Sequence, residues 1–213
     1  MKGYLVALTE ILLFFLTASN ARSAFPDLNK FSPVTYYWFC FTVLTGIWEM
    51  VYISNYDKIA HFADKLVQKK ETVWTMDFPF YYVLPNFMSQ IFYAEYGANA
   101  DREYKREKKG DYWSKLIESS HALCCAAVSL CALLLTSVDV NKAIACGCVA
   151  MGMQFMNSLL YMGEYFEQCQ NPLNVNFISK SFPLGKWMSK RWFMWVNLPW
   201  LVFPSVIITQ ILT

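Results

Sequence analysis

The chain has 213 residues, of which 56% are hydrophobic, 18% are aromatic and only 16% are charged. Soluble domains carry roughly 25% charged residues, so this composition indicates an integral membrane protein, and the length indicates one domain. The formal net charge of +2 gives no reason to expect a nucleic-acid partner.

The cysteines do not form a metal-binding or disulfide pattern. No Cys-x-x-Cys pair is matched by a second pair or by suitably spaced histidines, so neither a zinc site nor a disulfide framework is predicted. Cys169 alone lies in a polar stretch, and the other six lie in apolar runs, where cysteine behaves as a small hydrophobic residue.

The first apolar run extends from Tyr4 to Leu16 and is interrupted by Glu10. It fits a retained membrane helix, which we expect, or a signal segment cleaved near residues 18–21. On the first reading, residues 1–33 form an N-terminal helix and linker, and residues 34–213 form a four-helix core.

The second predicted membrane helix, Val34 to Ile53, is rich in aromatic residues and carries Thr45 and Glu49. These two side chains are four residues apart and therefore share one helical face. Ionisable residues inside a membrane helix usually face a cavity or a partner, although Glu49 is close enough to the helix end to reach the interface instead.

A long connection from Asn55 to Asp111 holds most of the charge. Residues 78–96 within it are apolar and aromatic but are broken by Pro79 and Pro85, which predicts a short interfacial or re-entrant helix. The mixed-charge run at 101–109 predicts a solvated face.

Three more membrane helices are predicted, at 112–137, 143–165 and from about 191 to 212. The first carries Glu118 and His121, and the last carries Asn197 and Trp200, three residues apart. The middle one has a polar stripe, which normally faces the interior of a helix bundle. The stripe consists of Gln154, Asn157, Tyr161 and Glu164. The predicted fold is therefore an all-α membrane protein, a five-helix transmembrane bundle.

The polar side chains of this bundle are suited to moving protons. Glu49, Glu118 and His121 in one apolar cavity would let one group donate a proton while another accepts it. An indole such as that of Trp200 stabilises a cation held against its face. These groups suit a reaction that protonates a lipid at one carbon and deprotonates it at another.

Two other readings of these residues stay open. Glu118 and His121 have the Glu-x-x-His spacing of di-iron bundles, but such sites use the motif twice with two further carboxylates, and it occurs here once. No metal or cofactor is therefore expected. Glu118 and His121 could also serve structure alone, bonded to each other and to nearby backbone.

From about Trp38 to Leu212 the chain resembles the emopamil-binding protein family, the sterol Δ8–Δ7 isomerases of the EXPERA group. The strongest match is Asn197-Leu-Pro-Trp200-Leu-Val-Phe-Pro204, which is similar to the family's Asn-x-x-Trp-Leu-Val-x-Pro. Weaker matches lie elsewhere in the right order: Glu95-Tyr96, Asp101-Arg-Glu-Tyr104, Lys115-Leu-Ile-Glu118, Gln154 and Leu160-Tyr161.

The resemblance implies a cavity for sterols and lipophilic amines in the membrane of the endoplasmic reticulum, with the mitochondrial inner membrane as the alternative. Glu49 and Glu118 would handle protons, with His121 beside them, and Trp200 would lie against the carbocation. Further ligand contacts are expected from the remaining polar residues, Thr45, Gln154, Asn157, Tyr161 and Asn197.

Two departures from the family pattern open alternatives. Thr45 stands where the isomerases carry a histidine, and Ser158 stands where they carry an acid; His121 would return an imidazole from another wall. The chain is thus expected to be a sterol isomerase or a lipid-binding protein without turnover. The competing expectation is a structural subunit of a homodimer or larger membrane complex.

Overall fold

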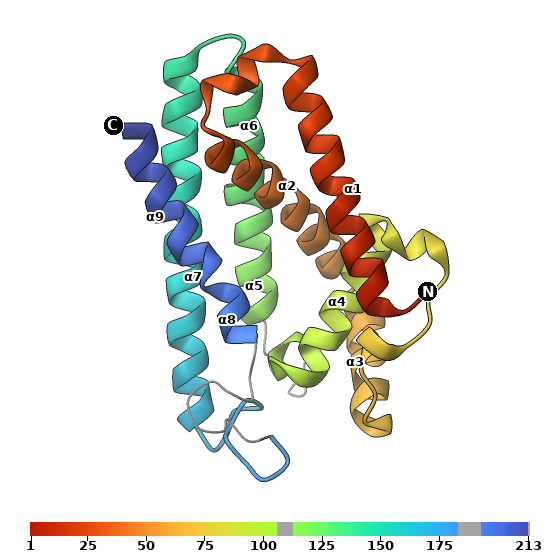
Figure 1. Cartoon of the computed structure of the whole chain (residues 1–213). Coiled ribbons are helices and arrows are strands. Elements are labelled where there is room, and N and C mark those ends of the chain that lie inside the picture. Colours follow the sequence, from red (N-terminus) through yellow and green to blue (C-terminus); the bar gives the residue numbers. More distant parts are fainter. Residues whose placement is uncertain (106–112, 183–192, 213) are drawn as a thin grey trace.

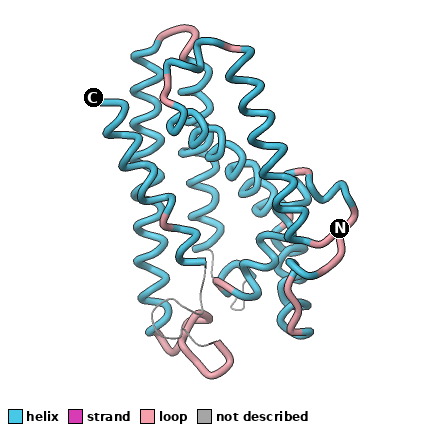
Figure 2. The backbone as a smooth tube through the Cα atoms, viewed as in Figure 1, coloured by secondary structure: helices cyan, strands magenta, loops and turns pink. Residues whose placement is uncertain are grey.

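The computed structural model describes residues 1–105, 113–182 and 193–212, with the backbone alone at 193–194. Every regular element in these ranges is a helix, and the single isolated β-bridge joins Lys2 to Asp77 (Figure 2). The predicted all-α class is confirmed.

Nine α-helices are present in the described ranges (Figure 1). They are α1 (Gly3–Ala24), α2 (Pro33–Ser54), α3 (Tyr56–Lys69), α4 (Pro85–Asn99), α5 (Trp113–Ser120), α6 (Ala127–Leu135), α7 (Val140–Gln170), α8 (Phe193–Asn197) and α9 (Pro199–Leu212). A π-helical turn, His121–Ala126, joins α5 to α6, and four short 3₁₀ segments lie in the connections: Pro26–Lys30, Val73–Thr75, Phe80–Val83 and Arg102–Lys105.

Four helices of the described chain are long and apolar enough to cross a membrane. They are Gly3–Ala24, Trp113–Leu135, Val140–Gln170 and Trp195–Leu212. The predicted count of five is not confirmed, because α2 does not belong to this group. Tyrosine, tryptophan and threonine lower its mean hydropathy, and 11 of its 22 residues are buried, so α2 crosses the interior of the bundle (Figure 1).

The first helix is longer than the predicted run, since α1 continues to Ala24. Most of its apolar side chains face outward, and it is attached to α2 through polar contacts. The indole N–H of Trp48 donates to buried Glu10 over 3.0 Å, and the hydroxyl of Tyr36 donates to the Ala18 carbonyl over 2.7 Å.

The long connection contains two helices where one was predicted. α3 was not predicted; its apolar side chains recur at Ile59, Ala63 and Leu66 among charged neighbours. α4 begins at Pro85, a residue that suits the first turn of a helix because its missing N–H is not needed there. α4 packs against α2 and α3 and contributes to the core, and the predicted interfacial or re-entrant placement is not confirmed.

The charged segment that follows α4 is not the solvated face that was predicted. The side chains of Asp101, Glu103 and Lys105 are only 1%, 3% and 7% exposed. Asp101 accepts hydrogen bonds from Tyr161 and Asn176, and Lys105 pairs with Asp64 at 2.9 Å. Buried charge persists because such partners replace water. The rest of the predicted run, 106–109, lies outside the described residues.

The last membrane helix is interrupted. α8 ends at Asn197 and α9 starts at Pro199, since proline has no N–H to donate to the carbonyl of Trp195. Instead, Leu198 bonds that carbonyl over 3.2 Å, and Val202 restarts the α-helical pattern on Leu198 at 3.0 Å. The predicted last membrane span is therefore present as Trp195–Leu212 but broken at Leu198; its opening residues, Arg191 and Trp192, lie outside the described ranges.

Candidate functional site

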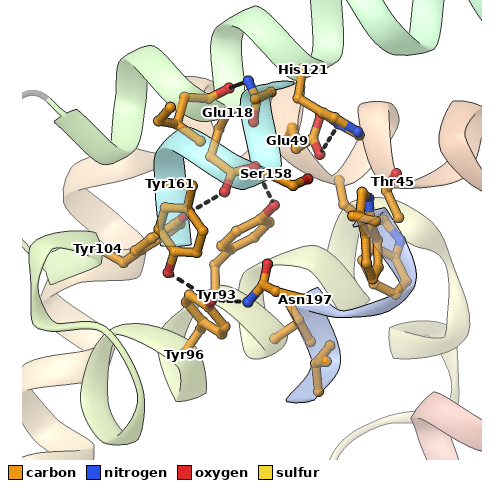
Figure 3. A pocket seen from close by; sticks show the side chains of 16 residues that line it. Thr45, Glu49, Tyr93, Tyr96, Tyr104, Glu118, His121, Ser158, Tyr161 and Asn197 are labelled. Carbon is orange, nitrogen blue, oxygen red and sulfur yellow. Dashed lines mark hydrogen bonds and ion pairs between the residues drawn. The ribbon is translucent and has the colours of Figure 1, made fainter. Parts of the chain in front are cut away.

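A cavity of about 90 Å³ lies where α2, α4, α5, the π turn, α7 and the α8–α9 segment meet (Figure 3). Its wall mixes carboxyl, imidazole, hydroxyl and aromatic groups. The lining residues are Thr45, Trp48, Glu49, Phe92, Tyr93, Tyr96, Tyr104, Ile117, Glu118, His121, Asn157, Ser158, Tyr161, Val196, Asn197 and Trp200.

Eight of the nine residues predicted from the sequence line this one cavity. The ninth, Gln154, lies behind His121 and bonds to its ring. Residues from four separate predicted membrane helices therefore converge, although their chemical roles remain predictions. Glu164, the last member of the predicted polar stripe, is exposed. At 100° per residue, ten residues turn its side chain about 80° away from Gln154.

Glu49 and His121 form the centre of one wall. Nδ1 of His121 lies 2.5 Å from Oε1 of Glu49, and both side chains are almost completely buried. The N–H direction is not aligned with that oxygen, and Oε2 of Glu49 has no hydrogen-bond partner in the described chain. At this separation a proton could pass between the two groups once they are aligned.

The π turn and a glycine bring these two groups together. An ideal Cβ on Gly46 would lie 2.2 Å from Cβ of Ala126, so only glycine lets α2 approach the π turn this closely. The π turn adds a residue to the helical register from His121 onward, three residues after Glu118. π turns are frequent at functional sites, and this one turns His121 toward Glu49 (Figure 3).

Glu118 lies on a neighbouring part of the cavity wall and has different hydrogen-bond partners. Tyr93 donates its hydroxyl to Oε2 over 2.9 Å, and Tyr104 donates to Oε1. Glu118 therefore bonds to these phenols and not to His121; a purely structural role for the two residues stays an alternative prediction. Tyr93 and Tyr104 were not predicted as site residues, because they come from the long connection; the Asp101–Tyr104 match was the one signal pointing to them.

Gln154 connects His121 to α2. Its Nε2 lies 2.9 Å from Nε2 of His121 and donates to Thr42 Oγ1 over 3.2 Å. Its Oε1 accepts from the indole N–H of Trp38 over 2.7 Å. Gln154 is completely buried, so the amide is fixed by these partners and not by water.

Two of the predicted ligand contacts, Thr45 and Asn157, line the cavity and also bond within the protein. The hydroxyl of Thr45 donates to the carbonyl of Thr42 over 3.0 Å, so it does not replace the imidazole that the family carries there. Asn157 donates to Ser120 Oγ over 2.6 Å and to the Ile117 carbonyl over 3.2 Å. Asn157 thus attaches α7 to α5.

A chain of hydrogen bonds fixes the third side of the cavity. Asn197 donates to the hydroxyl of Tyr96 over 3.2 Å, Tyr96 contacts the hydroxyl of Tyr161 at 2.8 Å, and Tyr161 donates to Asp101 over 2.8 Å. Tyr96 was quoted in the resemblance but not predicted as a site residue. The α8 end is therefore attached to α4 and α7 by polar groups.

Trp200 follows the helix break and still lines the cavity. Its ring lies 5.5 Å from that of Trp38 and 5.7 Å from that of Phe41. Asn197 and Trp200 were expected to share one helical face; they reach the same cavity across the Leu198 break instead.

Within the described residues, no group of three or more histidine, cysteine, aspartate or glutamate side chains gathers as metal ligands would. The seven cysteines are free thiols. Comparisons with family models, with curated proteins and with solved structures find no match to this chain.

Proposed function

We propose that the cavity transfers protons to and from a membrane lipid and shifts a double bond in a sterol ring. This proposal takes its substrate class from the resemblance to the emopamil-binding protein family. The observation that supports it best is the meeting of Glu49, Glu118, His121 and Trp200 at one cavity.

The two carboxyl groups would take opposite roles. Glu49 gives a proton to one carbon of the double bond, which leaves a cation on the neighbouring carbon. Glu118 removes a proton from the next carbon, and that C–H electron pair forms the new double bond. One proton enters and one leaves, so the reaction needs no oxidant, reductant or metal.

The hydrogen-bond partners support this assignment. Two phenol donors suit a group that holds negative charge before it accepts a proton, as at Glu118. Glu49 has an oxygen without a partner, which leaves room for a proton directed at a ligand. Trp200 would face the cation, whose attraction to an indole face strengthens in a dry site.

The size of the cavity constrains how a sterol would bind. Sites that enclose such ligands usually measure about 300–1,000 Å³, well above the volume of this cavity. The wall at Val196, Asn197 and Trp200 belongs to a segment that is half exposed at Trp195 and Val196. A sterol would enter here from the membrane and move this segment outward.

A five-helix membrane arrangement is part of the proposal. α2 has 22 residues and is therefore about 33 Å long, enough to cross a bilayer core of about 30 Å. Its buried polar face would then line the cavity at membrane depth. Residence in the endoplasmic reticulum rests on the family resemblance alone.

A second candidate is sterol binding without turnover. It is favoured by Thr45, whose hydroxyl is engaged with the Thr42 carbonyl and supplies no proton to the cavity. In that case His121 and Glu49 would serve to hold a cationic or hydroxyl group of the ligand.

Expression in cells that lack their own Δ8–Δ7 isomerase tests both candidates. Conversion of Δ8 sterols is expected, together with saturable sterol binding by the purified protein. Binding without conversion would establish the second candidate. Well-folded protein that neither converts nor binds sterols would overturn both.

A further inference from the structure

The neighbours of His121 determine which of its two ring nitrogens carries the proton. A neutral imidazole carries its proton on either Nδ1 or Nε2, and the partner of each nitrogen decides which. Here Nδ1 faces Oε1 of Glu49 (Figure 3). Nε2 faces the side-chain amide of Gln154. The orientation of that amide therefore determines the tautomer.

Trp38 fixes the orientation of the amide. An indole nitrogen only donates hydrogen bonds, so the atom of Gln154 that lies 2.7 Å from Trp38 Nε1 must be the amide oxygen. The opposite orientation would set the NH₂ group of Gln154 against the indole N–H, two donors facing each other without water.

The amide NH₂ then points at His121. Gln154 Nε2 donates to Nε2 of the imidazole at 2.9 Å and to Thr42 Oγ1 at 3.2 Å. The receiving imidazole nitrogen must be unprotonated, so the neutral ring carries its proton on Nδ1. That N–H is on the side of Glu49.

We propose that Trp38 and Gln154 are positioning residues that hold His121 with its proton on Nδ1, beside Glu49. Neither residue touches the reacting atoms. Once a ligand aligns the pair, the held N–H supports the carboxylate that remains on Glu49 after it gives its proton to the ligand. This catalytic consequence rests on the proposed function, whereas the tautomer itself does not.

Nitrogen NMR of the full chain in lipid nanodiscs measures the tautomer directly. The sequence contains two histidines, and the other one, His61, is exposed on α3. A His61→Gln background labelled with ¹⁵N-histidine leaves His121 as the single reporter. At a pH where the ring is neutral, Nδ1 is expected to carry the proton and Nε2 to be unprotonated. Protonated Nε2 in this protein would overturn the proposal.

Two substitutions interrupt the contacts that run from Trp38 through Gln154 to His121, each at a different point. Trp38→Phe keeps an aromatic ring but removes the indole N–H, so Gln154 can turn and the Nε2–H form is expected to appear. Gln154→Glu offers the imidazole an oxygen in place of the NH₂ group, so protonated Nε2 is expected to dominate. Trp48→Phe is the matched control, because it removes an indole N–H that serves Glu10. The control should keep the Nδ1–H form.

The result is interpretable even if one variant fails to fold. An unchanged tautomer in whichever of Trp38→Phe and Gln154→Glu folds would overturn the positioning role. If sterol turnover is present, Trp38→Phe should lower kcat by about tenfold or more, within the range of general acid–base effects, and leave KM nearly constant. Absence of turnover would remove the proposed function but leave the tautomer measurement valid.

Discussion

Two parts of the cavity wall each contain a glutamate, but the two carboxyl groups have different neighbours. Glu118 accepts hydrogen bonds from two phenols, Tyr93 and Tyr104. Glu49 pairs with the imidazole of His121 and lies next to the carboxyl group of Glu118, and its Oε2 has no hydrogen-bond partner in the described chain. Pairs of titratable groups in contrasting environments are the usual basis for separate donor and acceptor roles. The contrast is the strongest argument for assigning proton donation to Glu49.

The contrast originates in the elements that build each wall. The Glu118 wall depends on a stack of tyrosine rings, with Tyr52 and Tyr93 at 4.5 Å and Tyr93 and Tyr104 at 5.7 Å between centroids. The Glu49 wall depends on the close approach of α2 to the π turn at Gly46. Aromatic packing thus holds the Glu118 wall, and the Glu49 wall can form because Gly46 has no side chain.

The largest expected effect comes from removing the proton of Glu49. Glu49→Gln keeps the size of the side chain but cannot donate a carboxyl proton, so turnover of a Δ8 sterol should fall by about 10²–10⁴-fold. The measurement is kcat in purified protein. Glu164→Gln is the matched control, because Glu164 is an exposed glutamate on α7 and its loss should leave kcat unchanged. Equal rates in both variants would remove Glu49 from the mechanism.

The second prediction tests the geometry of the Glu49 wall. Gly46→Ala places a Cβ 2.2 Å from Cβ of Ala126, so α2 and the π turn must move apart. The free energy of unfolding should fall by about 1–3 kcal/mol, the usual cost of overpacking, and Glu49 should separate from His121.

A second glycine in a helix provides the control for Gly46. A Cβ on Gly152, within α7, meets nothing within 4 Å, so Gly152→Ala should be neutral or stabilise the protein by up to about 1 kcal/mol. Thermal unfolding in detergent compares the two variants. An equal loss of stability in both variants would show that the close approach at Gly46 does not hold the Glu49 wall.

The sequence predicted which polar residues lie together better than it predicted the tyrosines and the irregular helix geometry around them. Spacing within helices placed Thr45 with Glu49 and grouped Gln154 with Asn157, because side chains three or four residues apart share a face. The convergence of different helices was anticipated from their polar residues alone, since a polar group on an apolar helix needs an interior partner.

What was missed depends on tertiary contacts or on departures from regular geometry. Tyr93 and Tyr104 lie in a connection whose aromatic residues are equally typical of a membrane interface, so nothing local marked them as partners of Glu118. A regular period of 3.6 residues cannot foresee the π turn at His121. The break at Leu198 had a local signal in Pro199, but proline inside membrane helices is often tolerated.

The smallest expected effect tests the Glu118 wall. Tyr93→Phe and Tyr104→Phe each remove one hydroxyl donor and keep the ring in its stack, so each should lower the free energy of unfolding by about 1 kcal/mol. Combining each with Glu118→Gln separates the hydrogen bond from other effects of losing the hydroxyl. If the phenols act on the carboxylate, the loss in the double variant is smaller than the sum of the single losses. Additive losses would mean that the tyrosines support the wall by packing alone, and the contrast between Glu118 and Glu49 would then rest on His121.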